Sequence, residues 1–299
     1  MNQQLTRQQF DILSFLTLEK QPVSQNQIKE NTSYSLEMIK CIMSELKEYG
    51  FVNDRTITVS GIAALEPYRV KRAVFIAAGF GKRLVPVTLN TPKPLVRVDG
   101  KRIIDRLIDA CLAIGITEIY IVRGYLSEQF DQLLYKYPMV RFLENPVYGE
   151  TNNISSSMVA RYFLSNAYVF EADLLISNPK IITPYHYTSD FLAIRKDSTD
   201  DWCFTVKDGV ITEEKTGGTG CWQMVGISYW NKEDGAKLSN DIKEVFENSP
   251  GGKDCYWEQV PLVFNKEHYK VRIRECYDSD IVEIDTFSEL KAADRAYDV

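Results

Sequence analysis

Apolar residues recur at helical spacing through the first part of the chain. Residues 5–20, 24–32 and 35–51 each follow this spacing and predict three helices, the second of them short and capped. The apolar positions are Phe10, Leu13, Phe15 and Leu16 in the first helix and Leu36, Ile39, Ile42 or Met43, and Leu46 in the third. The stretch FVNDRTITVSG then alternates around the pair Asn53-Asp54, which predicts a hairpin. The pattern therefore predicts a separate small domain over residues 1–70.

The pattern changes after Val70, where buried strands alternate with helices. AVFIAA (73–78), EIYIVRG (118–124) and AYVFEAD (167–173) are strand-like, and IIDRLIDACLAIG (103–115) has helical spacing that ends at Gly115. KTGGTG (215–220) predicts a flexible turn. Strands separated by helices favour an α/β fold with a mostly parallel sheet over residues 71–299. Such sheets bind ligands at the carboxyl ends of their strands, which places Gly79–Arg83 and Asp173 at one edge.

Composition narrows the classes of ligand. The 299 residues are 44% apolar, as in a globular core, and the net charge of −6 disfavours a general affinity for nucleic acid or anionic membranes. Because the protein as a whole has no net positive charge to attract phosphates, a polyphosphate ligand must be bound by a few nearby side chains together with a metal ion. Six scattered cysteines and two histidines disfavour structural zinc and a disulfide framework. Neither a secretory signal nor a long apolar run is visible, so we expect a reduced, cytoplasmic protein.

A glycine loop with two cations follows the first strand. Gly79 and Gly81 allow backbone N–H groups to approach a phosphate, and Lys82 and Arg83 add positive charge. Leu84 stands where a dinucleotide fingerprint needs its third glycine, and the spacing of a P-loop is absent. Both familiar phosphate motifs are therefore excluded.

The longer phrase AAGFGKRLVPVTLNTPKPLV resembles the signature of the nucleotidyltransferases that make NDP-sugars and CDP-alcohols. The resemblance covers residues 72–299 and implies a Rossmann-like, mostly parallel mixed sheet flanked by helices. It also implies that the loop wraps the triphosphate of an NTP and that Arg83 binds phosphate oxygens. Lys93 would reach the attacking phosphate and the α-phosphate, where a cation offsets the repulsion between the anions. The loop residues concerned are Ala77, Ala78, Gly79, Gly81, Lys82 and Arg83.

ENPVYGETNNISSS resembles a loop of the LicC-type bacterial phosphocholine cytidylyltransferases. Asn152 and Asn153 distinguish it from the sugar-nucleotide enzymes, and Ser155 belongs to the same nucleotide-binding stretch. An asparagine side chain both donates and accepts, so it can read the edge of cytosine or hold a ribose hydroxyl. Paired asparagines are also common in turns.

Two strand-like segments carry acids. YVFEADLLIS contains Glu171 and Asp173, and IVEIDTFSEL contains Glu283 and Asp285. The resemblance implies that Asp173 and Asp285 bind Mg²⁺, a hard ion that carboxylates and phosphates suit. Glu171 and Glu283 point the same way as these aspartates in an alternating strand, either supporting the site or merely flanking it. Asp285 could otherwise cap a helix.

The segments RKDSTDDWCF, GISYW and KDCYWEQ resemble those that enclose the alcohol phosphate in the same family. Aromatic rings and carboxylates are the means of recognising a quaternary ammonium, which donates no hydrogen bonds. We predict Trp202, Tyr256 and Trp257 as rings, with Asp197, Asp201 and Glu258 as charge partners. Trp222 and Trp230 are predicted to be packed in the core.

The sequence thus predicts a Mg²⁺-dependent cytidylyltransferase that converts CTP and phosphocholine to CDP-choline and pyrophosphate. Phosphoethanolamine or 2-aminoethylphosphonate is the alternative acceptor, and a nucleotide-sensing regulator is the alternative of another class. Residues 1–70 resemble a winged helix-turn-helix, but Glu37, Glu45 and Glu48 on the third helix disfavour DNA as a partner and favour a docking or regulatory module. The sequence does not decide whether the protein is a monomer or a homodimer, or whether the chain is part of a longer protein.

Overall fold

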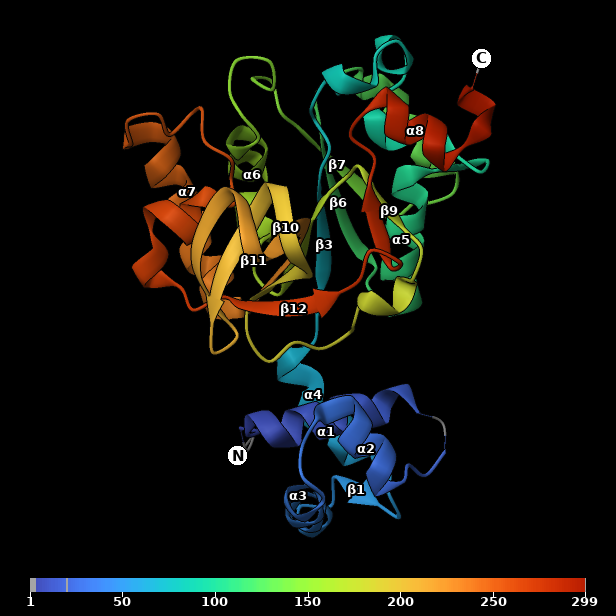
Figure 1. Ribbon diagram of the computed structural model, residues 1–299, viewed down its shortest axis with the longest axis vertical. Coiled ribbons are helices and arrows are strands. Elements are labelled where there is room, and N and C mark those ends of the chain that lie inside the picture. The colour runs from blue at the N-terminus through green and yellow to red at the C-terminus, as the bar shows by residue number, and fades with distance from the viewer. Residues whose placement is uncertain (1–3, 20, 299) are drawn as a thin grey trace. The chain divides into compact units, whose positions relative to one another are not determined.

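The computed structural model describes residues 4–19 and 21–298. The chain forms two compact units, one of the residues up to Arg69 with Tyr185–Tyr187, and one of Val70–Pro184 with the chain from Thr188 onward (Figure 1). None of the described helices is long and apolar enough to cross a membrane.

The first unit is helical with a short hairpin. Capping boxes begin its first two helices, where Thr6 pairs with Gln9 and Ser24 with Gln27. The order of helices and hairpin is the predicted one, while the assignment to winged helix-turn-helix domains stays a prediction. The elements are α1 (Arg7–Leu18), α2 (Gln25–Thr32), α3 (Leu36–Glu48), β1 (Val52–Asn53), β2 (Thr56–Ile57) and α4 (Val59–Leu65).

The predicted position of the hairpin turn in this unit is wrong. The hairpin turns at Asp54-Arg55, because these two residues have positive φ (45° and 65°) and Asn53 pairs with Thr56 in the ladder. Leu36 lies in the first turn of α3 and is 36% exposed, so the buried stripe of that helix begins only at Ile39.

Three residues from much later in the chain belong to the first unit. Tyr185 is buried in its core, and the ring of Tyr187 stacks on that of Tyr68 with 5.4 Å between centroids. Tyr187 also contacts Phe10 at 5.4 Å, and the backbone N–H of His186 donates to the carbonyl of Tyr68. The first unit is therefore a discontinuous piece of the sequence.

The second unit is built on a seven-stranded mixed sheet in the order β10-β12-β11-β8-β3-β6-β7. Neighbouring strands from β8 to β7 are parallel, and β11 runs antiparallel to both β8 and β10. The predicted α/β fold with a mostly parallel mixed sheet is confirmed. The strands are β3 (Arg72–Ile76), β6 (Glu118–Arg123), β7 (Val140–Glu144), β8 (Ala167–Glu171), β10 (Asp190–Lys207), β11 (Val210–Trp230) and β12 (Arg272–Cys276).

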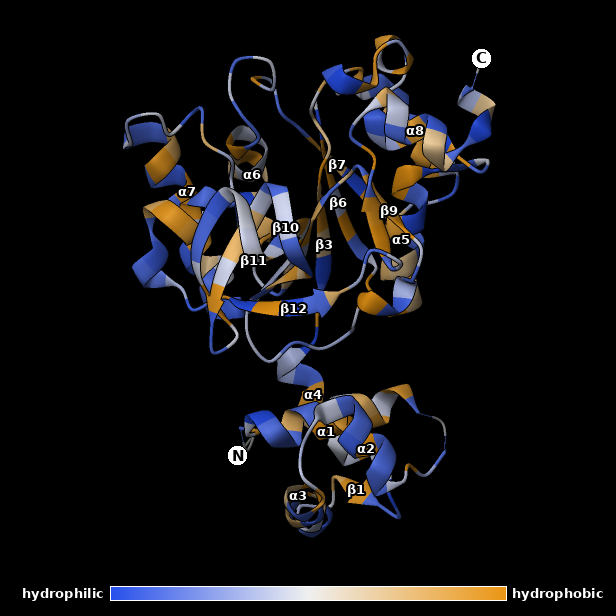
Figure 2. Cartoon of the chain, in the orientation of Figure 1, coloured by the Kyte–Doolittle hydropathy of each residue, from blue (hydrophilic) through white to orange (hydrophobic). Residues whose placement is uncertain are grey.

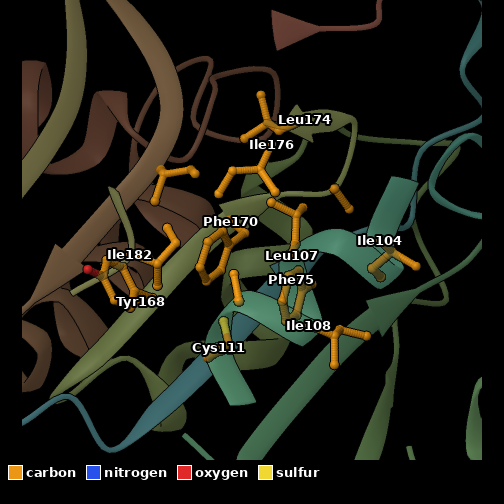
Figure 3. Packing of buried hydrophobic residues seen from close by; sticks show 14 of the residues in the cluster. Phe75, Ile104, Leu107, Ile108, Cys111, Tyr168, Phe170, Leu174, Ile176 and Ile182 are labelled. Atoms are coloured by element: carbon orange, nitrogen blue, oxygen red, sulfur yellow. The ribbon is translucent and has the colours of Figure 1, made fainter. Parts of the chain in front are cut away.

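Helices cover both faces of this sheet, because its strands are apolar on both sides. Ala73 and Phe75 of β3 belong to one core and Val74 to the other. In the first core Phe75 and Phe170 stack and pack against Leu107 and its neighbours (Figure 3). The helices of the second unit are α5 (Ile103–Ala113), α6 (Ile154–Ala160), α7 (Lys232–Asn248) and α8 (Phe287–Ala293), and α8 packs in a separate small core with Leu84 and Val96.

The opposite core lies against α6 and α7. Leu238, Ile242 and Val245 of α7 are buried there, and the helix alternates hydrophobic and hydrophilic bands in Figure 2. This is the pattern of a helix with one buried face.

KTGGTG is not a turn. It lies inside β11, where Gly217 and Gly220 have positive φ (73° and 57°). The ladder with β10 is irregular between Thr199 and Trp202, so the glycines accommodate local distortion of a long hairpin.

Two short ladders sit beside the main sheet. One is the hairpin β4 (Arg97–Val98) and β5 (Lys101–Arg102), and the other pairs β9 (Leu174–Ile176) with β13 (Ile281–Glu283) in antiparallel fashion. Leu174 opposes Glu283, and the Ile284 N–H donates to the Asp173 carbonyl at 3.1 Å. This ladder brings two segments more than a hundred residues apart to one place.

We predict that Gly235→Ala destabilises the second unit by about 1–3 kcal/mol, because overpacking a tight contact forces the backbone to move. A Cβ at Gly235 would lie 2.5 Å from the Leu164 carbonyl oxygen and from Ser165 Cα. Denaturant unfolding measures the change. Gly149→Ala is the matched control, since a Cβ there meets nothing within 4 Å. Equal stability of the two variants would contradict the prediction.

Candidate active site

Lys93 lies between two carboxylates at the edge of the second unit's sheet. Its Nζ donates to Asp173 Oδ2 and to Asp285 Oδ1, both at 2.7 Å. Arg83 Nη2 donates to the same oxygen of Asp285 at 2.7 Å. Four residues that the sequence analysis singled out therefore form one connected group of charges.

The backbone around each of these charges is fixed by buried apolar neighbours. Leu84, Val96 and Ile284 belong to one small core, and they adjoin the turns that carry Arg83, Lys93 and Asp285.

Gly81 allows the glycine loop to approach Lys93. It has φ +68°, and a Cβ there would lie 3.2 Å from Lys93 Cβ and 3.2 Å from Thr88 Cγ2. The hydroxyl of Thr88 donates to the Gly81 carbonyl at 2.9 Å. A side chain at this position would strain the backbone and push the loop off the lysine.

The charges of the group support one another. Burial lowers the pKa of Lys93, but Asp173 and Asp285 outweigh it and raise this pKa above its ordinary value. Burial likewise opposes ionisation of Asp285, yet Lys93 and Arg83 hold the pKa of that carboxyl below its usual range. Lys93 is thus a fixed cation near neutral pH, although only 8% of its surface is exposed.

A second set of acids lies beside this group. Carboxylate oxygens of Glu171, Asp173 and Glu283 lie within 4.8 Å of one another. Burial, followed by repulsion from Asp173 and Asp285, raises the pKa of Glu283 to about 9, and burial followed by Glu258 raises that of Glu171. Such crowding of like charges needs protons or a cation to offset it.

The donor set fits a hard divalent cation. Asp173 Oδ1 is buried and lacks a hydrogen-bond partner within the described part of the chain, while the other oxygen faces Lys93. An orphaned carboxylate oxygen amid further carboxylates is the kind of ligand that Mg²⁺ takes. A fixed lysine next to such a site can hold phosphate oxygens on its free side.

The comparisons with known proteins agree with this chemistry. The sequence profile "Nucleotidyl transferase" matches residues 72–178. The 2-aminoethylphosphonate cytidylyltransferase of Lancefieldella rimae is 36% identical over 230 residues, which covers 75% of this chain and 92% of that protein. The chain belongs to the cytidylyltransferases of the nucleotidyltransferase family.

A further curated protein and a solved structure support the LicC-type resemblance. The choline-phosphate cytidylyltransferase of Streptococcus pneumoniae is 31% identical over 225 residues, covering 74% of this chain and 95% of that protein. The solved structure of the CTP:phosphocholine cytidylyltransferase LicC from the same species matches with a TM-score of 0.70 at 30% identity, covering 76% of this chain and 99% of that one. The predicted enzyme class is confirmed.

The asparagine pair of this cytidylyltransferase ties two loops together. Asn152 Nδ2 donates to the Asp254 carbonyl at 3.1 Å, and Asn153 Oδ1 accepts the Trp257 backbone N–H at 2.8 Å. Ser155 is buried, and its hydroxyl donates to the Asn152 carbonyl and accepts from Asn145. All three residues position the loop in this structure, and their contact with a nucleotide stays a prediction.

The predicted aromatic group is only partly assembled. The rings of Trp202 and Tyr256 meet edge to face, with centroids 5.4 Å apart. Trp257 is 3% exposed and packs between Phe191 and Trp230, which contradicts its assignment as a wall of the substrate site. The physical reason is that the large apolar ring of Trp257 is buried against Phe191 and Trp230, which leaves the neighbouring Tyr256 as the ring that faces outward.

The three carboxylates predicted as charge partners also differ in how exposed they are. Asp197 is exposed, and Asp201 accepts from its own neighbour's backbone N–H and from Gln223. Glu258 is buried and lies next to Asn153. Trp230 is buried in the core and Trp222 is partly buried against it, as predicted.

Sequence reasoning missed two residues near this site. Gly226 has φ +68°, and a Cβ there would lie 2.6 Å from Glu171 Oε2, so only glycine leaves room for that acid. Glu214 of β11 has both carboxylate oxygens buried. Neither residue stands in a recognisable motif, because both lie inside a long strand whose partner strand was not predicted.

We predict that Asp173→Asn abolishes turnover and leaves the fold intact, since it removes a charge and keeps the shape. Pyrophosphate release at saturating Mg²⁺ measures the loss, and thermal unfolding checks the fold. Asp109→Asn, at an aspartate whose carboxylate pairs with Lys136 on the surface, is the control. Activity within about tenfold of wild type would contradict the role of this carboxylate.

Lys93→Ala is expected to lower kcat by about a hundred- to a thousandfold, as when one electrostatic stabiliser of a transition state is removed. The KM for CTP should change much less. Steady-state kinetics separate the two effects, and Lys101→Ala, at an exposed position of β5, serves as the control. A change confined to the KM for CTP would make Lys93 an ordinary triphosphate ligand.

Proposed function

We propose that this enzyme transfers CMP from CTP to a small phosphate or phosphonate that carries an ammonium group. The observation that carries the proposal is the cation Lys93, held between Asp173 and Asp285 next to the glycine loop. The relatives named above, both of which are cytidylyltransferases, support CTP as the nucleotide.

The arrangement suits direct attack of one phosphorus oxyanion on another. An oxygen of the acceptor forms a bond to the α-phosphorus of CTP, and the bond from that phosphorus to pyrophosphate breaks. The acceptor is already anionic near neutral pH, so no general base is required. Two of the three N–H groups of Lys93 are engaged by carboxylates, which leaves the third to donate to an oxygen of the reacting phosphates.

Mg²⁺ is the proposed cofactor. Asp173 and Asp285 were predicted as its ligands, and Glu171 and Glu283 lie close enough to assist them. When bound, the ion would neutralise the charge of the triphosphate. The protein's own contribution is to hold Asp173 with one unpartnered oxygen and to aim Arg83 and Lys93 at the same space.

Phosphocholine and 2-aminoethylphosphonate are the two candidate acceptors. Trp202 and Tyr256 offer an aromatic wall of the kind that attracts an ammonium group. The relatives named for choline phosphate favour phosphocholine. The relative named for 2-aminoethylphosphonate, at 36% identity, favours the primary amine.

The first unit is proposed to be a docking or regulatory module of winged-helix type. The residues proposed for the chemistry all lie in the second unit. On α3, Glu37 and Glu48 are exposed, which is a poor surface for phosphates.

A substrate panel tests the proposed function. Each of four nucleoside triphosphates is offered with phosphocholine, phosphoethanolamine, 2-aminoethylphosphonate and glucose 1-phosphate, and pyrophosphate release is measured with Mg²⁺ and with EDTA. We expect turnover with CTP and an ammonium-bearing acceptor, and its loss in EDTA. Preference for a hexose phosphate, or for another nucleotide, would overturn the proposal.

A further inference from the structure

Two buried carboxylates near the proposed acceptor region have no cation to neutralise them. Glu258 is 3% exposed, and its Oε2 lacks a hydrogen-bond partner among residues 4–19 and 21–298. Both oxygens of Glu214 are buried and equally unpartnered over the same ranges. Burying an acid in this way is costly unless a partner is supplied.

Elsewhere in the unit, buried acids are paired. Asp105 accepts from Arg102 at 3.0 Å, and Asp190 accepts from Arg274 at 3.3 Å. In these two cases the negative charge of a buried carboxylate is balanced by an arginine that donates a hydrogen bond to it. Glu214 and Glu258 depart from this rule, which points to a partner that comes from outside the chain.

The two acids belong to one region. The β10–β11 ladder pairs Trp202 with Thr216 and Phe204 with Glu214, so Trp202 and Glu214 lie on the same face of the hairpin. Burial, followed by repulsion from Glu258, raises the pKa of Glu214 to about 8. The ring of Trp202 meets that of Tyr256, two residues before Glu258, with centroids 5.4 Å apart, so the loop of Glu258 lies against this face of the hairpin.

The strand that carries Glu214 also reaches the catalytic carboxylates. A Cβ at Gly226 of β11 would lie 2.6 Å from Glu171 Oε2, and Glu171 lies in the cluster with Asp173 and Glu283. The side chain of Asn153 bonds to Glu258 and favours its charged form, although burial still raises the pKa of Glu258 to about 7. An acceptor with its phosphorus at Lys93 would extend from this cluster toward Glu258 and Trp202.

We propose that Glu214 and Glu258 bind the ammonium group of the acceptor and select a primary ammonium over a trimethylammonium. This inference rests on the proposed function. The unpartnered atoms are three acceptor oxygens, one on Glu258 and two on Glu214. A primary ammonium has three N–H donors, whereas a trimethylammonium has none and leaves buried acceptors unbonded. Trp202 and Tyr256 then cover the carbon chain and the cation.

The test uses the full chain and steady-state pyrophosphate release with CTP and Mg²⁺. Glu258→Gln and Glu214→Gln keep the shape and remove the charge. Each should raise the KM for 2-aminoethylphosphonate by about ten- to a hundredfold, the effect of losing a hydrogen bond to a charged group. The KM for CTP and the turnover of ethylphosphonate, which lacks the ammonium, should stay within about threefold of wild type.

Glu213→Gln is the matched control, because Glu213 adjoins Glu214 on β11 but is exposed and accepts from Thr205. It should change none of these constants. Wild-type enzyme should prefer 2-aminoethylphosphonate or phosphoethanolamine to phosphocholine in kcat/KM, and both glutamine variants should reduce that preference.

Three results would overturn the inference. They are a wild-type preference for phosphocholine, a preference untouched by both substitutions, and an equal loss with ethylphosphonate, which would indicate a structural role. If no ammonium-bearing acceptor is turned over, the proposed function fails, and the subsite is judged by binding alone. Stabilisation against heat by 2-aminoethylphosphonate beyond that by ethylphosphonate, lost in Glu258→Gln, would still support it, and equal stabilisation would reject it.

Discussion

The ion pairs of Lys93 are the interaction on which the site depends. A lysine that is almost fully buried keeps its charge only because two carboxylates are held 2.7 Å from it. These three residues come from the start, the middle and the end of the second unit, so the charge arrangement exists only when that whole unit is folded. The fold and the chemistry are therefore selected together, since any slip of β9 against β13 would move Asp285 away from Lys93.

The architecture explains how positively and negatively charged side chains are held close together in a fixed arrangement. Strand ends and tight turns carry the polar residues, and Leu84, Val96 and Ile284, near Arg83, Lys93 and Asp285, are buried in one small core. Glycines at two points of closest approach, Gly81 and Gly226, make room where a side chain would collide. The rigidity of the site thus comes from apolar packing and backbone shape, and the charges are left available for ligands.

The sequence predicted the features that repeat or stand in long motifs. The β3, β6 and β8 strands and the α5 helix follow from apolar patterning, and Arg83, Lys93, Asp173 and Asp285 followed from a resemblance whose family is now shown. Features that depend on contacts between distant parts of the chain could not be predicted from the sequence. The pattern could not tell that Trp257 turns inward while Tyr256 turns outward, or that KTGGTG continues a strand. Glu214 gave no signal, because a buried acid and a surface acid look alike until the opposing strand is known.

The inclusion of Tyr185–Tyr187 in the first unit has a consequence for biosynthesis. A domain made of consecutive residues can finish folding as soon as it leaves the ribosome. Here the core around Phe10 and Tyr68 is complete only when Tyr187 has been translated, well after the β3, β6 and β8 strands. Part of the apolar surface of the amino-terminal unit therefore stays exposed while the first strands of the central sheet are being synthesised. This unit can complete its core only after much of the second unit has been translated.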